Sequence, residues 1–231
     1  MSYDILLFDA DRTLYDFDAS EKLAFFEVAP NYGVIPTDDN FELYKKINNE
    51  NWQALEMGLF KKDRIVVRRF EQFLQAVGVQ GDAVKMNDDY LTALSKKSIL
   101  FEDTIALVER LKQAGKRMFL ITNGVTKVQL GRIDGSPLQP YLENIFISEQ
   151  MNVSKPQKLF FDLVAQNISN YSSERAIVIG DSLTSDIQGA NNAGLDCIWL
   201  NPENAPNEKG LRVTYEAKTL MQIADFILSK D

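Results

Sequence analysis

The sequence contains no histidine, a single cysteine (Cys197) and, among its 12 glycines, no Gly-x-Gly pair. The lack of histidine excludes Ser-His-Asp and Cys-His nucleophilic catalysis, histidine phosphatases and His-rich zinc sites. One cysteine excludes an intramolecular disulfide and any cysteine cluster for zinc or iron–sulfur. The missing glycine pattern excludes the dinucleotide-binding fingerprint. Any chemistry must therefore use carboxylates, lysine, hydroxyls, backbone amides or a hard metal ion.

Long apolar runs and an excess of basic charge are also missing. The 231 residues include 25 basic and 33 acidic side chains, a formal net charge of −8, and 45% are hydrophobic. This charge disfavours nonspecific binding to nucleic acid or to anionic membranes. The first apolar run, Ile5 to Phe8, is too short for a signal peptide, and no run approaches the length of a membrane span. We therefore expect a cytoplasmic protein with no nucleic-acid or membrane partner, as a monomer or a homodimer.

Short apolar segments alternate with amphipathic helical patterns along most of the chain. Helical patterns cover residues 104–114, 125–132, 158–166, 185–193 and 219–228. The strand-like segments are bounded by polar residues or glycine and cover residues 5–8, 118–121, 145–147, 176–179 and 197–200. This alternation predicts an α/β fold with a doubly wound, parallel, Rossmann-like sheet.

One interval of about 85 residues breaks this alternation. From Tyr15 to about Leu100 there is no convincing strand, and four helical patterns follow one another at residues 19–28, 38–57, 62–76 and 83–97. A crossover between parallel strands does not need this length. We therefore predict an all-helical domain over residues 16–100, inserted into a core made of residues 1–15 and 101–231.

Chemically active side chains gather where the predicted strands end. Each alone is usually a helix cap, a turn residue or a solvated lysine. However, ligands bind beyond the carboxyl ends of the strands in open α/β sheets, and four strand ends supply such groups here. They are Asp9, Asp11 and Thr13, then Thr122, Asn123 and Gly124, then Ser148 with Lys155, and finally Asp181, Ser182 and Asp186.

The residue types in this set indicate phosphoryl chemistry at a metal ion. Asp9 and Asp11 are two residues apart on an extended segment and so share one face. Together with an acid from another strand they form a hard oxygen cage of the kind that magnesium prefers. Lys155 and Thr122, with the amides of a helix start, can stabilise or bind the oxygens of a phosphoryl group.

The ordered motifs Asp9-Ala-Asp11-Arg-Thr13, Thr122-Asn-Gly124, Lys155-Pro156 and Gly180-Asp181…Asp186 resemble those of haloacid dehalogenase (HAD)-superfamily hydrolases. The resemblance covers essentially the whole chain, and the helical insertion looks like the cap domain of that superfamily. Finer matches are similar to the branch that contains the pyrimidine 5′-nucleotidases. They are Leu14-Tyr-Asp-Phe17, Ile47-Asn48, Trp52, Glu56-Met-Gly58 and Arg69-Phe70.

The resemblance implies a magnesium-dependent phosphomonoester hydrolase that acts through an aspartyl-phosphate, with pyrimidine nucleoside 5′-monophosphates as first substrates. Asp9 would be the nucleophile and Asp11 the general acid and base. The implied phosphate-binding residues are Asp9, Thr122, Asn123 and Lys155. The implied Mg²⁺-binding residues are Asp9, Asp11 (through its backbone carbonyl), Asp181 and Asp186, of which Asp186 would lie behind the direct ligands or bind the metal through water.

Two features of the chain sharpen or complicate this resemblance. Arg12 stands where the family has a small, polar or acidic residue, and it would either recruit an anionic substrate or lie in a solvent-facing turn.

In the insertion, aromatic residues are more often part of the hydrophobic core than ligand contacts, yet a cap must present some side chains to the substrate. Our candidates for that role are Phe17, Asn48, Asn49 and Trp52.

Two alternatives remain open at this stage. A sugar-phosphate phosphatase or a phosphomutase would use the same core with a different cap chemistry. A phospho-accepting regulatory module also combines an acidic cluster with a threonine and a lysine on a doubly wound sheet. In such modules, however, the phospho-accepting aspartate lies on the third strand, and no insertion of about 85 residues follows the first.

Overall fold

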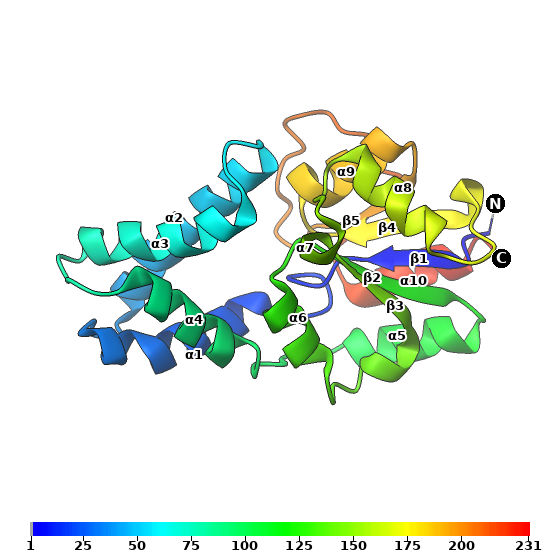
Figure 1. The fold of residues 1–231 in the computed structure, drawn as a ribbon. Coiled ribbons are helices and arrows are strands. Elements are labelled where there is room, and N and C mark those ends of the chain that lie inside the picture. The colour runs from blue at the N-terminus through cyan, green and yellow to red at the C-terminus, as the bar shows by residue number, and fades with distance from the viewer. Residues whose placement is uncertain (1) are drawn as a thin grey trace. The chain divides into compact units, whose positions relative to one another are not determined.

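The computed structural model describes residues 2–231, which divide into two compact units (Figure 1). The first unit contains the described residues up to Asp16, together with Leu100–Thr126 and Ile133–Asp231. The second unit contains Phe17–Ile99 and Lys127–Arg132. No helix within residues 2–231 is long and apolar enough to cross a membrane.

A six-stranded parallel sheet forms the centre of the first unit, with the strand order β3-β2-β1-β4-β5-β6. β1 lies between β2 and β4, so the strand order reverses beside it, and ligands bind at such a switch point in open α/β sheets. The predicted doubly wound parallel sheet is confirmed. The strands are β1 (Ile5–Phe8), β2 (Arg117–Thr122), β3 (Leu142–Ile147), β4 (Ala176–Gly180), β5 (Asp196–Leu200) and β6 (Tyr215–Ala217).

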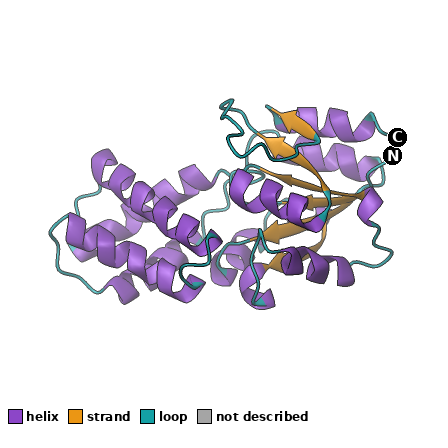
Figure 2. Ribbon diagram, turned by 90° about the horizontal axis from the view of Figure 1, so that it is seen from above, coloured by secondary structure: helices purple, strands orange, loops and turns teal. Residues whose placement is uncertain are grey.

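Helices cover both faces of this sheet (Figure 2). Leu6 and Phe8 pack with α5 (Thr104–Gln113) and α10 (Leu220–Leu228) on one face. Ile5 and Leu7 point to the other face and pack with α8 (Lys158–Gln166) and α9 (Gln188–Ala193). Because β1 is buried on both faces, its sequence is a continuous apolar run rather than an alternating one.

The structure differs from the predicted elements at several boundaries. β6 was not predicted, because Tyr-Glu-Ala is short and has no apolar run. The helix predicted from residue 185 begins instead as a π-helical turn, Leu183–Ile187, which leads into α9. The remaining short elements after β2 are α6 (Thr126–Ile133), the 3₁₀ turns Gln139–Tyr141 and Ser173–Arg175, and α7 (Ser148–Met151).

The second unit contains four complete helices and residues 127–132 of α6. The four are α1 (Phe17–Val28), α2 (Asp38–Glu56), α3 (Lys62–Ala76) and α4 (Ala83–Leu94). The 3₁₀ turn Ala29–Tyr32 follows α1. The side chains of Thr37 and Asp82 accept backbone hydrogen bonds at the starts of α2 and α4, which satisfies amides that have no partner within the helix. Stacked and edge-on aromatic rings fill the centre of this unit: Phe25, Tyr44, Phe70, Phe73 and Tyr90. The four predicted helices are thus confirmed, although the last ends at Leu94.

Candidate active site

Asp9 directly follows β1, the strand at the switch point of the sheet. Its backbone N–H donates to the carbonyl of Ile179 over 2.8 Å, so the aspartate is fixed between β1 and β4. The side chain is buried, and its Oδ2 accepts a 3.3 Å hydrogen bond from the hydroxyl of Thr13. The chain then turns back sharply, because the N–H groups of Leu14 and Tyr15 both donate to the carbonyl of Ala10. This turn holds Thr13 against Asp9.

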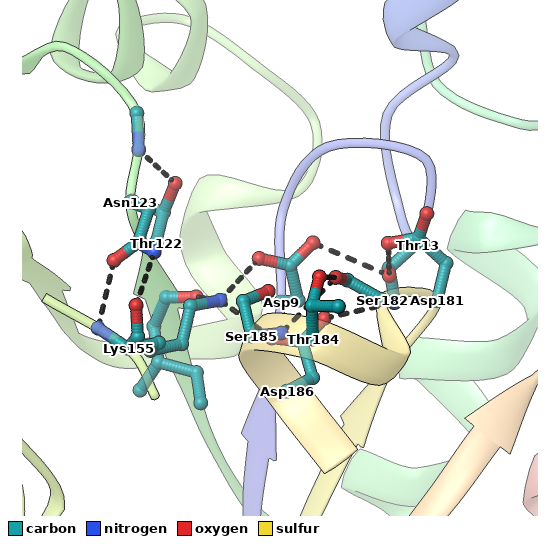
Figure 3. Close-up of polar contacts among 12 residues, drawn as sticks. Asp9, Thr13, Thr122, Asn123, Lys155, Asp181, Ser182, Thr184, Ser185 and Asp186 are labelled. Carbon is teal, nitrogen blue, oxygen red and sulfur yellow. Dashed lines mark hydrogen bonds and ion pairs between the residues drawn. The ribbon is translucent and has the colours of Figure 1, made fainter. Parts of the chain in front are cut away.

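Lys155 reaches Asp9 from the loop between α7 and α8. Its ammonium Nζ donates to Asp9 Oδ1 over 2.6 Å, to Asp186 Oδ1 over 2.7 Å and to the carbonyl of Ile121 over 2.9 Å (Figure 3). The side chain is only 1% exposed. Burial by itself would lower the pKa of Lys155, but the carboxylates of Asp186 and Asp9 raise it above its usual value. Lys155 is therefore a buried, charged ammonium. It is not a solvated loop lysine, which is the usual state of such a residue.

Asp181 and Asp186 come from the segment that follows β4. The Asp186 carboxylate is buried, and its Oδ2 accepts a hydrogen bond from the Ser182 N–H over 3.1 Å. Gly180 permits this arrangement, since a Cβ there would lie 2.4 Å from Asp186 Cγ. The π-helical turn therefore folds Asp186 back onto the end of β4, beside Lys155.

Trp199 also contacts this segment, although the sequence does not mark it as a site residue. The indole Nε1 of Trp199 donates to the backbone carbonyl of Asp181 over 2.8 Å. Trp199 pairs with Gly180 in the register between β4 and β5, so its position in the predicted strand at residues 197–200 was the available signal. The parallel pairing of these two strands places Trp199 beside Asp181.

Carboxylate oxygens of Asp9, Asp181 and Asp186 all lie within 4.8 Å of one another. Burial, followed by the charges of Asp186, Asp181 and Asp11, raises the pKa of Asp9 well above its ordinary value, and Lys155 opposes this shift. Burial and Asp186 also raise the pKa of Asp181 to about 7, while Arg12 and Lys155 act in the other direction. Three close, mutually repelling carboxylates, two of them on buried residues, are a donor set that fits a hard divalent cation.

Thr122 and Asn123 follow the neighbouring strand, β2. The Thr122 hydroxyl oxygen accepts a 2.9 Å hydrogen bond from the N–H of Gly124, which leads into α6. The carboxamide of Asn123 forms two hydrogen bonds with the backbone of Lys155. The structure thus brings the strand-end residues of β1, β2 and β4 together around Lys155, as the sequence predicted for one edge of the sheet.

Asp11 and Arg12 occupy the turn after Asp9, and both are half-buried. The Asp11 carboxylate is not among the three that cluster within 4.8 Å. The predicted role of its backbone carbonyl as a metal ligand stays a prediction. Arg12 adopts a left-handed backbone conformation (φ 62°), and its charge acts on Asp181. Arg12 therefore contributes positive potential to the acidic cluster.

The four residues of the helical unit that were predicted to contact the substrate differ in burial. Asn48 is buried, with its Nδ2 donating to Glu21 over 2.7 Å and its Oδ1 accepting from Arg69 over 2.9 Å. Both ends of its amide thus bind α1 and α3, which contradicts its predicted substrate-facing position. Phe17, Asn49 and Trp52 are half-buried, and their roles remain predictions.

The chain is similar to known proteins over most of its length. A family model described as haloacid dehalogenase-like hydrolase matches residues 3–194. Pyrimidine 5′-nucleotidase PynA of Streptococcus pneumoniae is 36% identical over 225 residues, covering 97% of this chain and 95% of that protein. Pyrimidine 5′-nucleotidase YjjG of Escherichia coli is 28% identical, covering 98% and 99%. A crystal structure of the HAD-hydrolase YfnB from Bacillus subtilis, bound to magnesium, superposes with a TM-score of 0.93 at 35% identity, covering 98% and 99%.

Proposed function

Because this chain belongs to the haloacid dehalogenase-like hydrolases, we propose that it hydrolyses pyrimidine nucleoside 5′-monophosphates at the Asp9 site. The chain is a phosphomonoester hydrolase of this family. The observation that carries the proposal is the buried ammonium of Lys155, held between the carboxylates of Asp9 and Asp186. The pyrimidine substrate class is supported by the two relatives named as pyrimidine 5′-nucleotidases.

In the first step, a carboxylate oxygen of Asp9 attacks phosphorus and the bond from phosphorus to the ester oxygen breaks. The leaving alkoxide takes a proton from the carboxyl group of Asp11, which acts as general acid. Lys155 and Thr122 stabilise the negative charge on the transferring phosphoryl oxygens. The products of this half-reaction are the nucleoside and an aspartyl-phosphate on Asp9.

In the second step, the Asp11 carboxylate removes a proton from a water molecule, and the resulting oxygen attacks phosphorus. The bond from phosphorus to the Asp9 oxygen breaks, so that inorganic phosphate leaves and the Asp9 carboxylate is restored. No histidine is needed, because one carboxyl group donates the first proton and accepts the second. This reaction fits a sequence that contains none.

Mg²⁺ is the cofactor that we propose for this site. Asp9, Asp181 and Asp186 supply the clustered carboxylate oxygens, and the backbone carbonyl of Asp11 completes the proposed set. A bound Mg²⁺ would neutralise the carboxylates and polarise the phosphoryl group. Lys155 already neutralises part of this negative charge and keeps Asp9 oriented.

We also propose that the helical unit is a cap that selects the nucleoside part of the substrate, with Phe17, Asn49 and Trp52 as candidate contacts. The test is a substrate panel with Mg²⁺: pyrimidine and purine nucleoside 5′-monophosphates, and several sugar phosphates. We expect the highest kcat/KM on pyrimidine nucleotides. Higher values on sugar phosphates would overturn the substrate assignment while leaving the phosphatase assignment intact.

The substitution Asp9→Asn tests the nucleophile. It changes little volume but removes the attacking carboxylate, so we expect turnover to fall at least about a thousandfold. The fold should survive, because a buried charge among like charges is lost. Asp162→Asn, which removes an exposed carboxylate paired with Lys158, is the matched control and should keep normal turnover. Near-normal activity of Asp9→Asn would disprove the mechanism.

A further inference from the structure

Asn123 holds the backbone of Lys155 with both ends of its side chain. The Nδ2 group donates to the Lys155 carbonyl over 2.8 Å, and the Oδ1 atom accepts from the Lys155 N–H over 2.9 Å (Figure 3). The two residues are 32 positions apart in the chain. This pair therefore joins the end of β2 to the loop that follows α7.

The position of the Lys155 backbone matters because of where its side chain ends. From this backbone the ammonium reaches Asp9 Oδ1, Asp186 Oδ1 and the Ile121 carbonyl, all within 2.9 Å. Charge-assisted hydrogen bonds of this length weaken steeply when the donor moves. A shift of the Lys155 backbone would consequently weaken the hydrogen bonds of the ammonium to two carboxylates of the site.

We propose that Asn123 is a positioning residue for Lys155, and that its carboxamide acts through the lysine rather than on the phosphoryl oxygens. The inference rests on the proposed function for its catalytic consequence, and it replaces the expectation that Asn123 binds phosphate with its side chain. One N–H and the Oδ1 atom of the carboxamide bind the Lys155 backbone, and this pair of bonds fixes the carboxamide against the lysine. The ammonium of Lys155, in turn, contacts the nucleophile.

A matched pair elsewhere in the chain separates this role from simple loop stabilisation. Asn207 makes the same two bonds with the backbone of Leu211, at 2.8 and 3.0 Å, in the loop after β5. That pair spans four residues and holds no member of the site. Asn207→Ala therefore controls for the loss of an asparagine-to-backbone pair.

The test combines Asn123→Ala with Lys155→Met and with the double variant. With Mg²⁺ present, we expect Asn123→Ala to lower kcat about 10- to 100-fold and to weaken the calorimetric affinity for inorganic phosphate by a smaller factor, because both effects pass through Lys155. In the Lys155→Met background, removing Asn123 should change kcat and phosphate affinity by less than threefold. Weaker phosphate binding caused by Asn123→Ala in both backgrounds would overturn the proposal, because it would indicate direct contact.

A measurement without turnover keeps this inference separate from the proposed function. In metal-free buffer, Asn123→Ala should lower the urea midpoint more in the wild-type background than in Lys155→Met, whereas Asn207→Ala should lower it equally in both. If Asn123→Ala lowers the urea midpoint equally in the wild-type and Lys155→Met backgrounds, the positioning role is overturned, even in an active enzyme. A wild-type protein without phosphatase activity would overturn the proposed function, and the urea cycle would still decide the inference. If Asn123→Ala fails to fold, Asn123→Asp keeps the volume and one acceptor and is expected to act in the same direction.

Discussion

Lys155 is a cation with almost no exposed surface, and its surroundings show why it is kept. Replacing a buried ion pair by apolar groups is often neutral for stability, so such a pair is weak evidence for a structural role. Here the ammonium lies among Asp9, Asp181 and Asp186, and these four groups carry a formal net charge of −2 when ionised (three carboxylates and one ammonium). A divalent cation would bring this sum to zero and so remove the repulsion between the cluster and an anionic phosphate. The negative charge of the cluster thus favours binding of the metal before the substrate.

Trp199 offers a test of how Asp181 is held. Trp199→Phe removes the donor to the Asp181 carbonyl, a hydrogen bond worth about 1 kcal/mol, or roughly fivefold in an equilibrium constant. We expect the Mg²⁺ concentration for half-maximal activity to rise about 3- to 10-fold, with kcat at saturating Mg²⁺ within about twofold of the wild-type value. The Mg²⁺-induced rise in Tm should shift to higher Mg²⁺ in parallel. Tyr141→Phe, which loses a hydroxyl bond to Glu109, should leave both curves unchanged.

Among the elements, the turn after β4 packs so closely that a single methyl group should disturb the site. A Cβ at Gly180 would lie 2.4 Å from Asp186 Cγ, so Gly180→Ala must displace that carboxylate from Lys155. Overpacking of this kind costs about 1–3 kcal/mol of stability. We expect the free energy of unfolding to fall by that amount and turnover to fall at least tenfold, measured by urea denaturation and steady-state kinetics.

Gly131→Ala is the matched control for this effect. A Cβ at Gly131 would lie 2.8 Å from Ser95 Cβ and 3.0 Å from the Ser95 carbonyl oxygen, within the helical unit and away from the carboxylates. The variant should therefore lose similar stability and keep its turnover per folded molecule within about twofold. Equal losses of turnover in the two variants would show that Asp186 has no special sensitivity.

The elements were largely predictable because their apolar patterns are local properties of the chain. Each buried strand had a run of branched or aromatic residues, and the four helices of the second unit had amphipathic spacing. β6 was missed because it pairs along one edge through three residues of ordinary composition. The π-helical turn was missed because its extra residue serves the contact between Asp186 and Gly180, which depends on tertiary packing.

For the candidate site, too, the sequence predicts the positions of residues but not their tertiary contacts. Asp9, Lys155, Asp181 and Asp186 could be placed together, since parallel strands end at one edge of a sheet. The partners of a side chain could not be read in the same way. The residue type of Asn48 fits a ligand contact, but Glu21 and Arg69 bind the two ends of its carboxamide, and neither partner is near it in the sequence.

The stability of the whole molecule should depend on pH through the same carboxylates. Raised pKa values mean that the folded protein binds more protons than the unfolded chain between about pH 4 and the folded pKa, which is about 7 for Asp181. Stability must therefore fall as pH rises through this window. We expect the metal-free protein to have a higher urea midpoint at pH 5.5 than at pH 8.

Adding Mg²⁺ should raise the midpoint more at pH 8 than at pH 5.5, because protons compete for the same oxygens. Asp181→Asn is the control, since it removes one of the two raised groups and should flatten the pH dependence of the metal-free protein. A metal-free midpoint that increases from pH 5.5 to pH 8 would contradict the burial of these charges. Chelation with EDTA should stop turnover, and added Mg²⁺ should restore it.

Helix α6 belongs to the helical unit through residues 127–132, although the segments on either side of them belong to the sheet-containing unit. Lys127 Nζ binds Asp88 over 2.8 Å and Thr92 over 2.7 Å, and Ser98 donates to the carbonyl of Arg132 over 2.7 Å. The helical unit is therefore not formed by one continuous segment of the chain, and residues 17–99 alone cannot be exchanged as a complete unit. A chimera that exchanges only residues 17–99 with a relative would pair a foreign surface with the native α6, whereas one that also exchanges residues 127–132 would transplant the module whole.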